Sequence, residues 1–219
     1  MIWLARLEID ADTARAESVS DSYAWHKKLW DCFPNVPEQK RTDIGFLTRI
    51  DMLEGAFRIW IMAKRKPARP QWCPSNGFAL KEIAASFLTH RYYAFDLRAN
   101  PVKTIVQRGT NGETLFRANG KRKCGKRVPL VKPEELRVWL DRKAAAGGFK
   151  IVEDKPLEIA PTVGSHFRKK GQEAYHGSVQ FRGVLEVTDT TQFSETYYTG
   201  IGSAKGFGFG LLLLAHVNL

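Results

Sequence analysis

The order in which short apolar segments succeed one another constrains the fold of this chain more than any other feature. Alternation of apolar and polar residues predicts a strand over residues 3–9, and the next apolar stripe predicts a helix over residues 23–33. Asp21 or Ser22 can cap this helix, and Pro34 ends it. Further segments predict strands over residues 44–50, 56–63, 92–97, 179–187 and 211–217, a strand that begins at residue 149, and helices over residues 133–146 and 190–198.

The succession strand, helix, strand, strand, short helix, strand is expected in both halves, although the two halves share negligible sequence identity. Residues 64–77 are rich in proline and predict a loop or a short broken helix. Residues 78–88 fit either a helix or a strand. Because this succession is typical of the ferredoxin-like βαββαβ fold, we expect an α+β protein with two tandem ferredoxin-like domains, residues 1–90 and 91–219.

Positive charge is unevenly distributed along the chain. The formal net charge is +11, and residues 98–132 hold ten basic side chains and a single acidic one. Smaller basic clusters lie at residues 64–66 and 168–170. Three basic runs in a chain of this size favour a polyanionic partner, with nucleic acid as the preferred class. A membrane surface is disfavoured because no long helix with a basic face is predicted, and a DNA-binding regulator because no helix-turn-helix pattern is present.

The cysteines and the N-terminal residues point to a reduced, cytoplasmic protein. The three cysteines are widely separated and form no CxxC pair, so neither a disulfide framework nor a zinc knuckle is predicted. The first residues lack a basic segment followed by an apolar one, and no apolar run is long enough to cross a membrane. The five histidines show no ligand spacing, so we expect no metal and no cofactor.

The first predicted helix carries a candidate catalytic set. Tyr23 and His26 are three residues apart and lie on neighbouring positions of one helix face, with Lys27 four residues from Tyr23. A single histidine beside an apolar stripe usually packs or lies on the surface. Its chemical alternative is RNA transesterification, in which the ribose 2′-OH attacks the adjacent phosphate. Histidine suits the proton transfer of that step near neutral pH, and the step needs no metal.

Five glycines fall within residues 200–210, between the last predicted helix and the last strand. A dinucleotide-binding loop would lie between a strand and a helix, in that order, and a phosphate-binding loop would place Ser or Thr after Gly-Lys, so neither motif fits. The segment is either a tightly packed connection or a cradle of backbone N–H groups near RNA phosphates, with Lys205 adding charge.

Four sequence motifs, in this order, cover nearly the whole chain. They are Tyr23-x-x-His26-x-x-Leu29-Trp30-x-x-Phe33-Pro34, residues 97–104 (LRANPVKT), residues 127–130 (RVPL) and the glycine-rich segment Gly200-Ile201-Gly202-x-Ala204-Lys205-x-Phe207-Gly208-x-Gly210. Together they resemble the CasE family, the CRISPR RNA-processing endoribonucleases of the type I-E Cascade complex within the RAMP superfamily.

The resemblance implies a function. The chain would cut CRISPR precursor RNA within each repeat, at the 3′ side of the stem-loop, without a metal. It would leave a 2′,3′-cyclic phosphate and a 5′-OH and stay bound to the mature guide RNA beside the other Cascade subunits. By the resemblance His26 and Tyr23 serve catalysis, and Lys27, in preference to Lys28, supplies a nearby basic group.

The resemblance also implies an RNA-binding surface formed by the glycine-rich loop and by basic residues of the second half. We expect RNA contacts from Gly200, Gly202, Ser203, Lys205, Gly208, Arg98, Lys103, Lys121, Arg122, Lys123, Arg168, Lys169 and Lys170. A basic hairpin or loop around residues 166–172 is expected to follow the stem phosphates. The alternative from another class is a non-catalytic RNA-binding scaffold, which the Tyr23/His26 pair argues against.

Overall fold

The computed structural model describes residues 1–40, 45–106, 108–120, 125–169 and 172–219, and for residues 40, 163, 165–169 and 172–175 only the backbone. The first half contains β1 (Ile2–Asp10), α1 (Ala11–Ala16), α2 (Ser22–Lys28), β2 (Phe46–Leu53), β3 (Ala56–Ala63) and β4 (Phe78–Ile83). The second half contains β5 (Tyr92–Ala99), β6 (Val102–Ile105), β7 (Lys126–Pro129), α4 (Pro133–Ala146), β8 (Phe149–Ile151), β9 (Glu158–Lys169), β10 (Gln172–Val187), α5 (Thr190–Thr199) and β11 (Leu212–His216).

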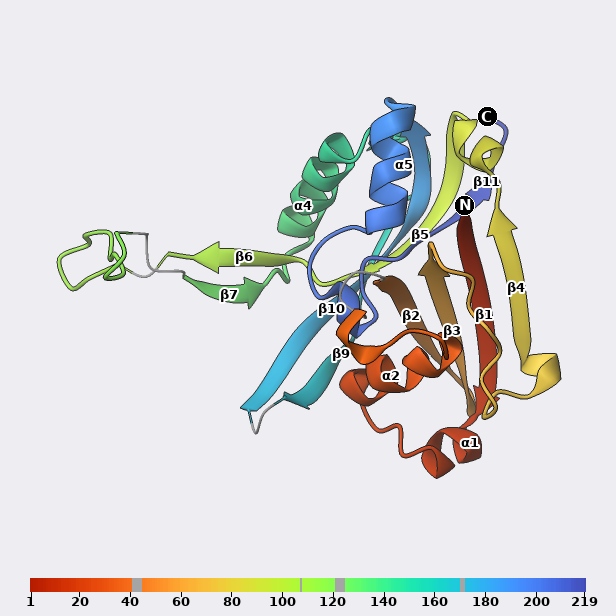
Figure 1. Ribbon diagram of the computed structural model, residues 1–219. Helices are drawn as coiled ribbons and strands as arrows, with labels where there is room; N and C mark the ends of the chain where they lie inside the picture. The colour runs from red at the N-terminus through yellow and green to blue at the C-terminus, as the bar shows by residue number, and fades with distance from the viewer. Residues whose placement is uncertain (41–44, 107, 121–124, 170–171) are drawn as a thin grey trace.

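These strands form two antiparallel sheets and a separate ribbon (Figure 1). The first sheet has the order β2-β3-β1-β4, and the second has the order β11-β5-β10-β8, with β9 also paired to β10. The long strands β9 and β10 extend as a hairpin beyond the second sheet, and the β6–β7 ribbon projects away from the body (Figure 1). The protein is therefore a mixed α/β structure built on antiparallel sheets.

The first predicted helix forms, but it is shorter than expected. Asp21 caps α2 by accepting hydrogen bonds from the backbone N–H groups of Tyr23 and Ala24 at 2.9 and 2.7 Å. After Lys28 the chain tightens into a 3₁₀ turn over Leu29–Cys32. This turn keeps Leu29 buried, so the apolar stripe continues although the α-helix has ended.

The short helix expected between the third and fourth strands of the first half is absent, so this expectation was wrong. Residues 64–77, which the structure describes in full, form a loop that ends in a 3₁₀ turn at Ser75–Gly77. Pro67, Pro70 and Pro74 remove backbone donors that a helix needs. Residues 78–83 adopt the strand alternative, because β4 pairs with β1 and satisfies its backbone there.

Two apolar clusters stabilise the fold. One lies between the first sheet and α2, where Leu7, Ile59 and Ile61 contact Trp25 and Leu29. The other combines residues of both halves; it includes Ile2, Leu47, Met62, Ile83, Leu97, Trp139, Phe181, Phe193 and Leu212. Helices α4 and α5 cover one face of the second sheet in this cluster (Figure 1). The first and second sheets thus share a core.

Among the described residues, none of the helices has the length and apolar character needed to cross a membrane.

Candidate active site and nucleic-acid interface

Helix α2 places the candidate catalytic residues in different surroundings. The His26 ring is half-buried, stacks on Phe46 of β2 at 5.6 Å and meets Trp30 edge-on at 6.4 Å. The Tyr23 ring is also half-buried, and the exposed Lys27 ammonium lies 4.6 Å from its centroid. Aromatic packing therefore fixes the imidazole, while the Lys27 charge stays near the Tyr23 ring.

Lys28, the alternative to Lys27, forms ion pairs with two carboxylates. Its Nζ lies 2.6 Å from Glu17 and 2.9 Å from Asp31. A cation held by two anions offers less to a phosphate than an exposed ammonium does. This geometry favours Lys27 as the basic group beside His26.

The glycine-rich loop has two structural parts. At its neck, Ile201 N–H donates to the Gly210 carbonyl and Gly210 N–H donates to the Arg98 carbonyl, both at 2.8 Å. A Cβ at Gly210 would lie 2.6 Å from the Ile201 carbonyl oxygen, and its φ of +85° also requires glycine. For the neck of the loop, the expectation of a tightly packed connection is therefore correct.

The tip of the loop faces α2. A Cβ built on Gly206 would lie 3.8 Å from Cε1 and 4.0 Å from Nδ1 of His26. A Cβ on Gly208 would lie 4.0 Å from the backbone nitrogen of Ile50 in β2. Tertiary folding thus brings together two motifs that lie near opposite ends of the sequence.

A cleft of about 410 Å³ opens where this loop meets the first half of the chain. Its lining comes from α2 and the residues before it, from β2, β3, β5, β9 and β10, and from the loop. It includes Ser20, Asp21, Ser22, Ile50, Arg98, Thr162, Ser178, Phe207 and Gly208. Ser20, Thr162 and Ser178 were not predicted from the sequence, because isolated hydroxyl residues carry no spacing signal.

The Lys205 ammonium group is partly buried and lies near another positive charge. Burial lowers the pKa of its ammonium, and the nearby charge of Lys143 lowers that pKa further. A phosphate beside Lys205 would offset both effects. The position of this residue at the tip of the loop therefore suits an anionic ligand.

A second histidine lies on the other side of the loop and was not predicted from the sequence. The His176 ring lies 5.1 Å from the Phe207 ring and 5.9 Å from the Phe209 ring, and its Nδ1 is 3.0 Å from the Asn100 amide nitrogen. Ser203 Oγ donates to the Asn100 carbonyl at 3.2 Å. The sequence signal that could have pointed to this group of residues is Asn100, which belongs to the motif over residues 97–104.

The basic residues predicted to contact RNA lie in different parts of the structure. Arg98 points toward the junction of the two sheets, with Nη2 2.8 Å from Asp51 and Nη1 donating to the Ile50 carbonyl. Lys103 Nζ lies 2.6 Å from Glu135. Arg168 and Lys169 end β9, which pairs with β10, so of the hairpin and the loop expected here the described backbone forms the hairpin. Lys121, Arg122, Lys123 and Lys170 lie outside the described residues.

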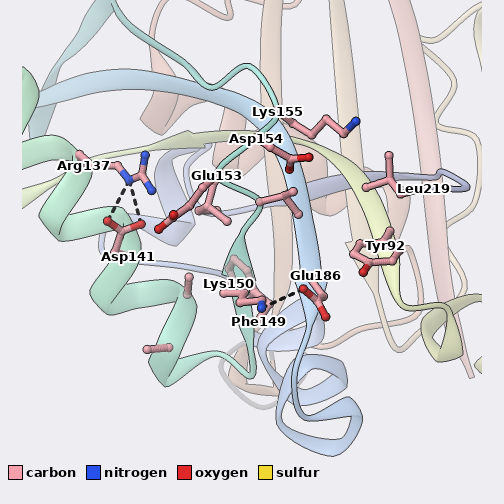
Figure 2. A pocket seen from close by; sticks show the side chains of 14 residues that line it. Tyr92, Arg137, Asp141, Phe149, Lys150, Glu153, Asp154, Lys155, Glu186 and Leu219 are labelled. Atoms are coloured by element: carbon pink, nitrogen blue, oxygen red, sulfur yellow. Dashed lines mark hydrogen bonds and ion pairs between the residues drawn. The ribbon is translucent and has the colours of Figure 1, made fainter.

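A larger cavity of about 860 Å³ lies between α4, β8 and Leu219 (Figure 2). Its charges are of both signs and include two ion pairs: Arg137 bonds Asp141, and Lys150 lies 3.0 Å from Glu186. None of the described candidate site residues lines it. In the described part of the chain, no three His, Cys, Asp or Glu side chains are grouped to hold a metal ion.

Comparison with known proteins identifies the family. A profile described as CRISPR associated protein matches residues 2–216, so the chain belongs to this CRISPR-associated protein family. The chain is 32% identical over 203 residues to the CRISPR system Cascade subunit CasE of Escherichia coli (strain K12), covering 92% of this chain and 95% of that protein.

Two further relatives agree with this assignment. The CRISPR-associated endoribonuclease Cse3 of Thermus thermophilus is 27% identical over 229 residues, covering 98% of this chain and all of that protein. The crystal structure of Cas6e from Escherichia coli K-12 superimposes with a TM-score of 0.69 at 26% identity, covering 99% of this chain and 100% of that chain.

Proposed function

We propose that this protein is a metal-independent endoribonuclease that cuts CRISPR precursor RNA within each repeat, at the 3′ side of the stem-loop. It then stays bound to the mature guide RNA as a subunit of Cascade. The names of its relatives, a Cascade subunit and a CRISPR-associated endoribonuclease, support this assignment. The observation that carries it is the close approach of the glycine-rich loop to His26 at Gly206, where an added Cβ would lie 3.8 Å from the imidazole.

The reaction is a transesterification within the RNA. The ribose 2′-OH attacks the adjacent phosphorus, its O–P bond forms as the bond to the 5′-oxygen breaks, and the products are a 2′,3′-cyclic phosphate and a 5′-OH. One proton leaves the 2′-OH and one is gained by the 5′-oxygen. His26 carries a proton transfer, and Tyr23 orients the 2′-OH or a phosphate oxygen.

Positive charge and N–H donors stabilise the developing phosphorane. Lys27 and Lys205 supply charge from opposite sides of the contact between α2 and the loop, and backbone N–H groups of residues 200–210 supply donors. The RNA stem lies outside this site, along the β9–β10 hairpin with Arg168, Lys169 and Lys170. Lys121, Arg122 and Lys123 provide a second contact, and Lys103 of β6 lies in the β6–β7 ribbon.

We also propose that residues 1–90 and 91–219 form two ferredoxin-like domains. In the four-stranded first sheet β1 and β3 are central and β2 and β4 lie at the edges, and in the five-stranded second sheet β5 and β10 lie between β11 and β8, with β9 also paired to β10; these strand orders support this division. The proposed location is the cytoplasm. The described cysteines, Cys32 and Cys73, are free and buried, as expected in a reducing compartment.

His26→Ala tests the catalytic assignment. We expect single-turnover cleavage of the host's own repeat RNA to slow by about 10²–10⁴-fold, because a proton-transfer group is lost, while stem-loop binding stays near the wild-type value. Tyr23→Phe, the matched milder variant, is expected to lose less. Near-normal cleavage by His26→Ala would remove His26 from the mechanism, and a larger loss in Tyr23→Phe would reverse the two roles.

A modified RNA tests the nucleophile independently of any protein variant. A single 2′-deoxy nucleotide just 5′ of the scissile phosphate is expected to abolish cleavage and leave binding intact, and EDTA is expected to have no effect. Cleavage of the 2′-deoxy RNA, or a metal requirement, would indicate attack by water. Binding of the repeat without cleavage by the wild-type protein would favour the RNA-binding scaffold.

A further inference from the structure

Two pairs of charged residues cross the junction between the sheets in opposite directions. Arg49 of β2 reaches Asp96 of β5 with Nη1 at 2.6 Å and Nη2 at 3.3 Å from the two carboxylate oxygens. Arg98 of β5 reaches back to Asp51 of β2 at 2.8 Å and donates to the Ile50 carbonyl at 2.6 Å. Each strand therefore contributes one cation and one anion to the same contact.

These charges are largely removed from water. The Arg49 side chain is 4% exposed, Asp51 is 16% exposed and Arg98 is 23% exposed. Asp96 is 29% exposed and also accepts hydrogen bonds from Gln180 and Arg182 of β10. A buried charge tolerates little displacement of its partner, whereas apolar contacts are non-directional. The four residues thus define one relative position of β2 and β5.

The two strands also carry the two parts of the candidate active site. Phe46 of β2 stacks on the His26 ring, and the tip of the loop at Gly208 approaches Ile50 of the same strand. The Arg98 carbonyl of β5 accepts the hydrogen bond from Gly210 that closes the neck of the loop. A shift of β2 against β5 would therefore move His26 relative to the glycine-rich loop.

We propose that Arg49, Asp51, Asp96 and Arg98 form an interface clamp that positions His26 against the glycine-rich loop. This proposal rests on the proposed function. All four are positioning residues, since each acts through the strand that carries it. The proposal gives Arg98 a role at the junction in place of the RNA contact expected from the sequence.

The clamp affects the chemical step more than RNA binding. Reaction rates depend steeply on the alignment of the reacting groups, and a displacement of about 1 Å costs on the order of 10²-fold. Stem binding is assigned to the β9–β10 hairpin, which extends beyond the second sheet (Figure 1). A disturbed clamp should therefore lower the cleavage rate and leave the dissociation constant of the stem-loop unchanged.

The experiment compares Asp96→Asn with the wild-type protein at a temperature at which circular dichroism shows both to be folded. We expect the single-turnover rate at saturating protein to fall by about 10–10²-fold. The dissociation constant of the uncleavable 2′-deoxy repeat RNA should stay within about twofold, since stem contacts are untouched. Glu186→Gln is the matched control: it breaks the pairs with Arg91 and Lys150 within the second half, and its rate should be that of the wild type.

If Asp96→Asn does not fold, a second set of variants tests the clamp. Arg98→Lys keeps the charge beside Asp51 but loses the two-pronged contact with Asp51 and Ile50, so an intermediate rate and unchanged affinity are expected. Asp51→Asn removes the charge that pairs with both Arg98 and Arg49, so its loss of rate should exceed that of Arg98→Lys, again with unchanged affinity.

The outcomes separate the clamp from the proposed function. If the wild-type protein does not cut repeat RNA, the proposed function fails. If the wild-type protein cuts and the folded variants cut equally fast, the clamp serves stability alone and the proposal is overturned. If Arg98→Lys instead weakens RNA binding with no change in rate at saturation, Arg98 is an RNA contact and the proposal is likewise overturned.

Discussion

At the scale of single residues, His26 and Tyr23 combine local and non-local requirements. Their spacing on one helix face follows from the sequence alone. The environment of His26 does not, because Phe46 comes from β2 and Gly206 from the far end of the chain. The imidazole is thus aligned by groups that no local pattern links to it.

His176 leads to a prediction about how the stability of the folded protein depends on pH. Burial lowers the pKa of its imidazole from the ordinary value of about 6.5. The folded protein therefore favours the neutral ring, and protonation would place a charge against Phe207 and Phe209. The stability that His176 contributes is complete above about pH 6.5 and is lost as the pH falls through the lower, folded-state pKa.

Melting temperatures between pH 7.5 and 5 test this prediction. His176→Gln keeps a polar side chain but does not titrate, so the variant should lose less stability on acidification than the wild-type protein. Parallel decreases of the two melting temperatures would show that other groups cause the acid sensitivity.

At the scale of elements, the β9–β10 hairpin provides the main prediction about RNA binding. Replacing Arg168, Lys169 and Lys170 together with alanine should weaken stem-loop binding. The slope of log K against log salt should decrease by about one to two units if about two phosphate contacts are lost. Cleavage at saturating protein should persist, because His26 and Tyr23 lie on α2.

The control removes the same number of charges elsewhere. Alanine at Lys64, Arg65 and Lys66, in the loop after β3, should alter the slope less. Equal effects of the two triple variants would mean that the overall positive charge, and not the hairpin, attracts the RNA.

At the scale of the whole molecule, the shared core makes a prediction about cooperativity. Ile2, Leu47 and Met62 of the first half pack in one apolar cluster with Leu97 and Leu212 of the second. Unfolding either half alone would expose this cluster to water. Scanning calorimetry should therefore show a single transition whose van't Hoff and calorimetric enthalpies agree. Two resolved transitions would indicate that the halves are thermodynamically independent.

The sequence by itself determined the features that depend on neighbouring residues. Asp21 caps α2 through groups two and three residues away, and Pro133 starts α4 because its own φ suits a helix. The βαβ-type succession, the β2–β3 hairpin and the chemical character of His26 were predicted in the same way.

Only the tertiary structure decided the features that depend on distant residues. Residues 78–83 became a strand because β1 offered an unpaired edge, and β-structure depends on such partners more than on local preference. The approach of Gly206 to His26 and the pairing of Arg49 with Asp96 need two sheets to pack together. Those contacts join residues far apart in the chain, and their geometry is set by packing and charge pairing, which no local sequence pattern encodes.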